Sequence, residues 1–147
     1  MNNVKIIKMK KNKDAPINVL LVDDDPDVLD VTIILLEKMG YMVASAKKSS
    51  DAINHMKKYN DAVDVVLTDF FMPDMNGLEL ASLIKKQGNN KPVILISGGS
   101  ELINKERVNE SGIAAIVQKP FSGIELDTAI KQVLEGEKRN NYEQGIA

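Results

Sequence analysis

The chain has 147 residues, of which 44% are hydrophobic, and carries a formal net charge of −2, which fits one folded domain with short tails. It has no cysteine, so a disulfide framework and a cysteine-ligated zinc site are excluded. No apolar stretch approaches the roughly 20 residues of a membrane helix, and no secretory signal begins the chain, so we expect a cytoplasmic protein without a membrane partner.

Residues 1–16 are predicted to form a basic, flexible N-terminal tail. The segment before the first acidic residue, Asp14, contains five lysines: Lys5, Lys8, Lys10, Lys11 and Lys13. No aromatic residue lies among them and the rest of the chain is acidic, which favours a solvated tail over an arm that binds nucleic acid or a membrane surface. We therefore expect no nucleic-acid partner.

The first predicted strand is the apolar run Asn18–Val22, which is typical of a strand buried on both faces. A helix is predicted over Pro26–Met39, because proline suits a first helical turn and Gly40 can end the helix. Asp25 is interpreted as the cap of this helix.

The alternation of strand and helix continues along the chain. In order, the remaining predicted elements are a strand over Tyr41–Ala46, a helix from Ser49 or Ser50 to Tyr59, a strand over Asp64–Thr68, a helix over Leu78–Lys86, a strand over Pro92–Ile96, a helix over Glu101–Ser111, a strand over Ile113–Gln118 and a helix over Ser122–Glu135. Residues 136–147 are predicted to be a flexible C-terminal tail, which leaves 17–135 as the folded domain.

Five predicted strands thus alternate with five predicted helices. Right-handed crossovers turn such an alternation into a parallel sheet with helices on both faces. We expect an α/β protein with the flavodoxin-like, doubly wound (βα)5 fold and the strand order 2-1-3-4-5.

Polar side chains stand at the carboxyl ends of four predicted strands. Asp23, Asp24 and Asp25 follow the first strand and Asp69 the third, while Ser97 and Lys119 follow the fourth and fifth. Ligands of such sheets bind outside these strand ends, so we expect these side chains to share one crevice.

The three carboxylates at this edge predict a metal site. Like charges held close together repel each other, and a divalent cation relieves the repulsion. Oxygen ligands without His or Cys favour Mg²⁺, or Mn²⁺. With Lys119 and Ser97 added, the set can stabilise a transferring phosphoryl group, and Asp69 as nucleophile would become an aspartyl phosphate.

The residues that carry this chemistry also resemble a known family. The motifs VDDDP at 22–26, TDFFMPDMNGLEL at 68–80, SGG at 97–99 and KPF at 119–121 are similar to those of response-regulator receiver domains, in the same order. The resemblance extends over about residues 17–135. A stand-alone receiver and a receiver cut from a longer protein, such as a hybrid sensor kinase, both fit it.

The resemblance implies a role for each site residue. Asp69 would be the phosphoacceptor, Asp24 a direct metal ligand, Asp23 the acid that holds metal-bound water, and the backbone carbonyl of Phe71 a further metal ligand. Ser97 would be the switch hydroxyl and Lys119 the partner of the phosphoryl group. The Lys119–Pro120 bond is expected to be cis, Pro73 and Gly77 shape the loop, and Asp74 and Asn76 are interpreted as turn formers.

Two positions depart from the family pattern. Ile116 occupies the switch position where the family often has Tyr or Phe. Phe71 occupies a position that in the family borders the path of the hydrolysing water, so the resemblance implies that Phe71 slows loss of the phosphoryl group, and we expect Phe71 and Gly99 to tune dephosphorylation.

The function implied by the resemblance is phosphorylation-dependent signalling. A histidine kinase or phosphotransfer protein would donate the phosphoryl group, and a protein target would read the change through roughly residues 101–134. The protein would not be an enzyme, although it would assist its own phosphorylation and dephosphorylation.

Three other functions fit the sequence less well. A flavodoxin-like electron carrier would place a flavin phosphate against three aspartates, which would repel it. A haloacid-dehalogenase hydrolase needs an aspartate where Phe71 stands. A pseudo-receiver that acts only as a phosphorylation-independent docking module is the remaining alternative.

Overall fold

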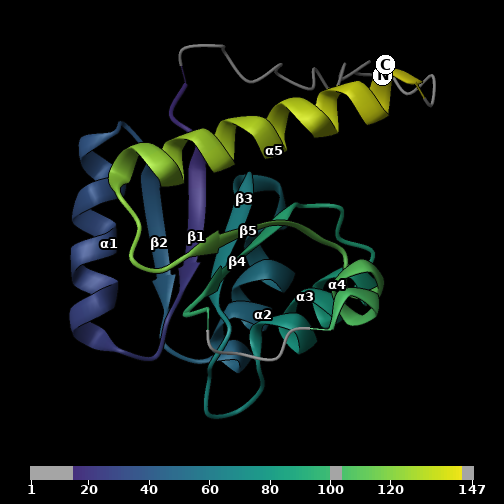
Figure 1. The fold of residues 1–147 in the computed structure, drawn as a ribbon. Coiled ribbons are helices and arrows are strands. Elements are labelled where there is room, and N and C mark those ends of the chain that lie inside the picture. The colour runs from purple at the N-terminus through teal and green to yellow at the C-terminus, as the bar shows by residue number, and fades with distance from the viewer. Residues whose placement is uncertain (1–14, 100–103, 144–147) are drawn as a thin grey trace, which may run out of the picture.

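Five parallel strands form the central sheet in the order β2-β1-β3-β4-β5 (Figure 1). The computed structural model describes residues 15–99 and 104–143. The strands are β1 (Asn18–Val22), β2 (Met42–Ala46), β3 (Val65–Asp69), β4 (Val93–Ser97) and β5 (Ile113–Gln118). The helices are α1 (Pro26–Lys38), α2 (Ser49–Tyr59), α3 (Gly77–Lys86), α4 (Lys105–Ser111) and α5 (Gly123–Glu143), with a short 3₁₀ helix, η1 (Asn60–Ala62), after α2. The strand order and the parallel pairing confirm the predicted flavodoxin-like fold.

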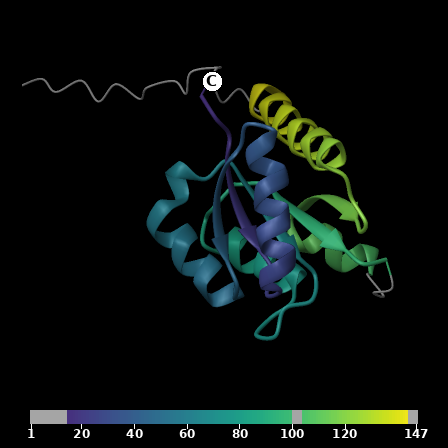
Figure 2. The ribbon, with the colours of Figure 1, turned by 90° about the vertical axis from the view of Figure 1, so that its left-hand side faces the viewer.

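Helices cover both faces of this sheet. Leu29 of α1 and Ile130 of α5 belong to a buried apolar cluster on one face. Met56 of α2 and Ile84 of α3 belong to the cluster on the other face. Figure 2 shows α2 and α5 on opposite sides of the strands. Because both faces are covered, the central strands can be apolar at almost every position.

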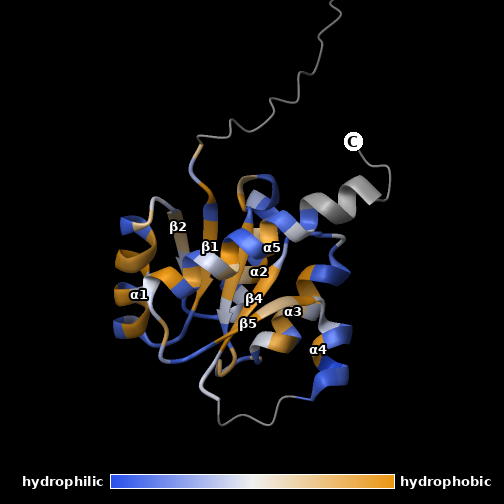
Figure 3. Cartoon of the chain, turned by 45° about the horizontal axis from the view of Figure 1, so that its top comes forward, coloured by the Kyte–Doolittle hydropathy of each residue, from blue (hydrophilic) through white to orange (hydrophobic). Residues whose placement is uncertain are grey.

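The middle of the sheet is the most buried part of the molecule. Every residue of β3 and β4 is buried, and the strands are mostly hydrophobic in Figure 3, whereas α4 is mostly hydrophilic. Two buried polar side chains, Asp69 and Ser97, end β3 and β4. They therefore stand out from an apolar background at the carboxyl edge of the sheet.

Two predicted helix boundaries need correction. The helix expected over Glu101–Ser111 begins at Lys105 after the cap residue Asn104, and residues 101–103 lie outside the described part. The last helix continues to Glu143 instead of ending at Glu135. Residues 136–143 are therefore helical, not the start of the expected tail.

The added turns of α5 face the segment that leads into β4. Gly136 and Glu137 line a cavity of about 480 Å³ together with Lys91 and Pro92 of that segment. A glycine inside a helix costs only about 1 kcal/mol relative to alanine, and Gly136 does not end the helix.

The turn after β5 holds the one cis peptide bond of the described residues, between Lys119 and Pro120. Among those residues, no helix combines the length and the hydropathy that a membrane-spanning segment requires.

Candidate functional site

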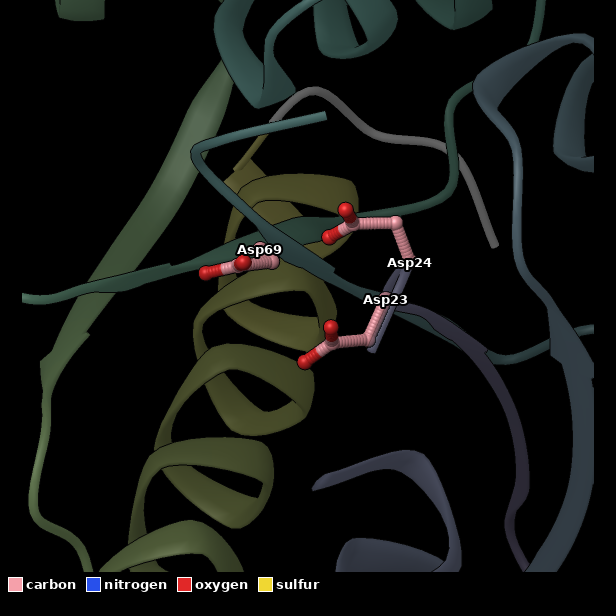
Figure 4. Close-up of side chains that lie close together, drawn as sticks. All are labelled: Asp23, Asp24 and Asp69. Carbon is pink, nitrogen blue, oxygen red and sulfur yellow. The ribbon is translucent and has the colours of Figure 1, made fainter. Parts of the chain in front are cut away.

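Three aspartates meet at the carboxyl edge of the sheet. Asp23 and Asp24 follow β1, and Asp69 ends the neighbouring strand β3. One carboxylate oxygen of each lies within 4.8 Å of those of the other two, and Figure 4 shows the three side chains close together. Asp23 and Asp69 are only 4% and 8% exposed, whereas Asp24 is exposed. The sheet thus forces two buried like charges together.

Local hydrogen bonds fix the first two acids. The backbone N–H of Asp23 donates to the carbonyl of Ala46 at 3.1 Å, which extends the pairing of β1 with β2 by one residue. Oδ1 of Asp23 accepts from the N–H of Asp25 at 2.9 Å. Asp25 in turn caps α1 by accepting from the amides of Asp27 and Val28, so its interpretation as a cap is confirmed. These bonds turn the chain sharply from strand to helix and leave Asp24 at the surface.

Asp69 is held by the loop that follows it. The N–H of Phe70 donates to the carbonyl of Ile96 on β4, and the N–H of Gly77 closes the loop by donating to the carbonyl of Phe70 at 2.9 Å. A Cβ at Gly77 would lie 2.6 Å from the backbone oxygen of Asp69. Only glycine fits there, because that distance is far inside van der Waals contact.

Lys119 brings a positive charge to the acids. Its Nζ lies 3.2 Å from Oδ1 of Asp69, and its backbone N–H donates to the carbonyl of Ser97 at 2.7 Å. Burial raises the pKa of Asp69 above its ordinary value, while the ion pair with Lys119 lowers it in part. Burial also raises the pKa of Asp23, and the charges of Asp69 and Asp24 add to that increase. Both shifts show that the pocket disfavours its own negative charge.

The donor set fits a hard divalent cation. The ligands on offer are carboxylate oxygens, and the penalty for charging Asp23 and Asp69 is what a cation would remove. A cavity of about 440 Å³ opens at this point. Its lining includes Asp23, Asp24, Asp69, Phe71 and Lys119, so five of the predicted site residues share one cavity.

Ser97, which was expected in the same crevice, is not among the residues that line this cavity. It is buried at the end of β4, and its Oγ accepts from the N–H of Gly99 at 3.1 Å. Gly99 has a φ of +85°, and a Cβ there would collide with the side-chain amide of Gln118. The turn after β4 is therefore built around a glycine, and it holds the Ser97 hydroxyl at the edge of the site.

The two departures from the family pattern are both at the surface. Phe71 is 61% exposed at the mouth of the cavity and meets the ring of Phe70 edge-on at 5.1 Å between centroids. Ile116 is 46% exposed on β5.

The contacts of one residue near the site were not predicted from the sequence. Asp74 was interpreted as a turn former, yet its carboxylate accepts the backbone amides of Ser49 and Ser50 at the start of α2. Nothing in the local sequence signals this contact, because the partners are about 25 residues earlier in the chain.

Comparisons with known proteins point to one family. The family model of the response regulator receiver domain matches residues 19–131. The chain is 35% identical to a transcriptional regulatory protein CpxR homolog of Haemophilus influenzae over 115 residues, covering 78% of this chain and 49% of that protein. It is 33% identical over 121 residues to the CAI-1 autoinducer sensor kinase/phosphatase CqsS of Vibrio cholerae, covering 80% of this chain and 17% of that protein.

Solved structures show the same similarity. A response regulator receiver domain protein from Clostridium thermocellum has a TM-score of 0.77 and 28% identity, over 83% of this chain and 97% of that one. The chain spans less than half the length of either curated relative named above.

Proposed function

The chain belongs to the response regulator receiver domain family, and we propose that Asp69 is the side chain that takes the phosphoryl group. Family membership supports phosphoacceptor signalling in a two-component system. The observation that carries the assignment is the position of Asp69, buried beside Asp23 and Asp24 and paired with Lys119 at 3.2 Å.

The transfer that fits these residues is a direct displacement at phosphorus. An oxygen of Asp69 forms the new P–O bond as the P–N bond of a phosphohistidine breaks, and the imidazole nitrogen keeps the electron pair. Lys119 holds Asp69 in its charged, nucleophilic form beforehand and then pairs with a phosphoryl oxygen. Ser97 donates its hydroxyl to another phosphoryl oxygen once it has moved toward the group.

Mg²⁺, or Mn²⁺, fits the same site. Asp24, Asp69 and the backbone carbonyl of Phe71 would hold the ion, and Asp23 would hold a metal-bound water. When bound, the ion neutralises charge on the transferring phosphoryl oxygens.

Phe71 and Gly99 are proposed to set the lifetime of the aspartyl phosphate. The Phe71 ring lies exposed at the cavity mouth, where it restricts the approach of water to the phosphorus. Gly99 leaves the turn after Ser97 without a side chain, so the backbone can follow the hydroxyl when it moves.

A protein target would read the phosphorylated state through roughly residues 101–134, of which 101–103 lie outside the described part. Movement of Ser97 toward the phosphoryl group would bias the turn after β4 and the adjoining α4. Ile116, exposed on this surface, would act without the aromatic ring swing that many receivers use. That same departure is the observation in favour of the second candidate, a pseudo-receiver that docks a partner without phosphorylation.

The donor would be a histidine kinase or a phosphotransfer protein. An apolar groove of about 560 Å³ lies between α1 and the turn after β5, and Val28 and Lys119 line both this groove and the acidic cavity. Val31, 58% exposed, also lines the groove. A protein that delivers a phosphoryl group to Asp69 would cover this groove and exclude water from the transfer.

Beryllofluoride, which mimics a phosphoryl group on an aspartate, tests the assignment. We expect a bound fluoride signal in ¹⁹F NMR for the wild-type chain with Mg²⁺, and no such signal for Asp69→Asn. Asp64→Asn, at the opposite end of β3, serves as the matched control and should bind like wild type. No bound signal in the wild type would favour the pseudo-receiver, and a bound signal in Asp69→Asn would contradict the assignment of Asp69 as the acceptor.

A further inference from the structure

The loop between β3 and α3 is fastened to a helix that is distant in the sequence. Oδ2 of Asp74 accepts the backbone N–H of Ser50 at 3.0 Å, and Oδ1 accepts that of Ser49 at 3.2 Å. Lys48, the residue at the N-cap position of α2, makes no side-chain capping bond. Asp74 therefore caps α2 from outside the helix, which is where a carboxylate is stabilised by free amides and by the helix dipole.

A second bond runs between the same two segments. The hydroxyl of Ser49 donates to the carbonyl of Met75 at 3.2 Å, and Ser49 is fully buried. Met75 also gives its N–H to Oδ1 of Asp74 at 3.1 Å. All three bonds between the two segments thus run from donors at the start of α2 to acceptors in the loop, and neither segment can shift alone without breaking them.

These contacts fix the part of the loop that follows Phe71 in the chain. Its base is closed by the bond from Gly77 to Phe70, and the side chain of Met72 is buried in the apolar cluster under α2 and α3. The backbone at Phe71 is held between these anchors. Its carbonyl is the one proposed metal ligand that does not come from a carboxylate.

Asp74 remains charged under ordinary conditions. Burial alone would raise its pKa, but hydrogen bonds from the amides of Ser50 and Ser49, its own amide and that of Met75 outweigh burial and lower the pKa. The hydrogen bonds that hold the loop therefore favour the charged form of Asp74.

We propose that Asp74 is a positioning residue: by tying the loop to the start of α2, it places the Phe71 carbonyl for Mg²⁺ and so raises the metal affinity of the acidic cavity. This role rests on the proposed function of the cavity. Asp74 itself would touch neither the metal nor the phosphoryl group. When the ligand atoms stay the same, metal affinity depends on how well the supporting residues hold those atoms in place.

The test compares Asp74→Ala with Asp64→Ala in the full chain. Asp64 is a matched control, because its Oδ2 also accepts a backbone amide distant in sequence, that of Asn18 at 2.7 Å, but at the opposite end of the sheet. We expect both variants to lower the thermal midpoint, and only Asp74→Ala to weaken Mg²⁺ binding in calorimetry, by about tenfold. Asp74→Asn, which keeps one acceptor oxygen, should recover part of that affinity.

Hydrogen exchange of the metal-free protein supplies a second readout. The amides of Ser49, Ser50 and Met75 should exchange faster in Asp74→Ala and at the wild-type rate in Asp64→Ala. Faster exchange with unchanged Mg²⁺ affinity would overturn the proposal, because the contact would then only stabilise α2. Equal loss of affinity in both variants would overturn it as well. A wild-type chain that binds Mg²⁺ but cannot be phosphorylated would contradict the proposed function and leave the role of Asp74 in metal binding intact.

Discussion

Lys119 reaches across an entire strand to pair with Asp69. The two residues follow β5 and end β3, with β4 between them, and yet Nζ and Oδ1 lie 3.2 Å apart. The β4 backbone helps to hold the span, because the carbonyl of Ser97 accepts the N–H of Lys119. The pair places a cation where a phosphoryl oxygen would arrive.

Replacing this cation should slow phosphorylation. For Lys119→Met we expect the initial rate of phosphorylation by acetyl phosphate to fall by about 100-fold, because one charge-stabilising donor is lost. Lys131→Met is the matched control, since Lys131 pairs with Asp127 on the outside of α5 at 3.0 Å. Equal rates in Lys119→Met and in the wild type would remove Lys119 from the mechanism.

Neutralising Asp23 should stabilise the metal-free protein. A carboxyl whose pKa is raised by folding contributes stability at low pH, and that contribution is lost as the pH rises through the raised pKa. At pH 7 in EDTA we therefore expect Asp23→Asn to raise the thermal midpoint by about 3 °C. Saturating Mg²⁺ should then raise the midpoint of the wild type more than that of the variant. A lower midpoint for Asp23→Asn in EDTA would show that the acidic cluster is not strained.

Asp127 should show the opposite pH dependence. It accepts a hydrogen bond from the hydroxyl of buried Tyr41 at 2.5 Å, and this bond lowers the pKa of Asp127. Its stabilising contribution is present above the ordinary aspartate value of 3.8 and is lost as the pH falls through the lowered pKa. We expect Asp127→Asn to lower the free energy of unfolding at pH 7 by roughly 1–2 kcal/mol. Urea titrations at several pH values measure the difference in free energy of unfolding between the variant and the wild type. We expect this difference to disappear in strong acid. A difference that stays constant with pH would mean that the charge of Asp127 is irrelevant.

Opening the cavity mouth should shorten the life of the aspartyl phosphate. We expect Phe71→Asn to speed loss of the phosphoryl group by roughly tenfold, because the exposed ring no longer restricts water. Ile124→Asn is the control, since Ile124 is 72% exposed on α5, away from the cavity lining. The decay of phosphorylated protein after removal of the donor is the measurement, and an unchanged decay rate would rule out the role of Phe71.

The sequence predicted most of the fold because its strands are short apolar runs that end in polar residues. The fold class then placed Asp23, Asp24, Asp69 and Lys119 at one edge, as observed. Contacts between segments distant in the chain could not be predicted in this way. Asp74 looks like an ordinary turn residue, because its partners at the start of α2 are brought to it only by the folded sheet.

The end of α5 was not predicted from the local sequence either. Gly136 is the first residue of the expected tail, but α5 continues through it to Glu143, and Gly136 and Glu137 line a cavity with the segment before β4. Local propensity is a weak preference, so a single glycine does not fix where a helix ends.

Whether Asp69 accepts a phosphoryl group is tested by the mass of the intact protein after incubation with acetyl phosphate and Mg²⁺. We expect one added phosphoryl group on the wild type, none on Asp69→Asn and none when EDTA replaces the metal. An unmodified wild type, or an Asp69→Asn variant that still gains the mass, would contradict the assignment of Asp69 as the acceptor.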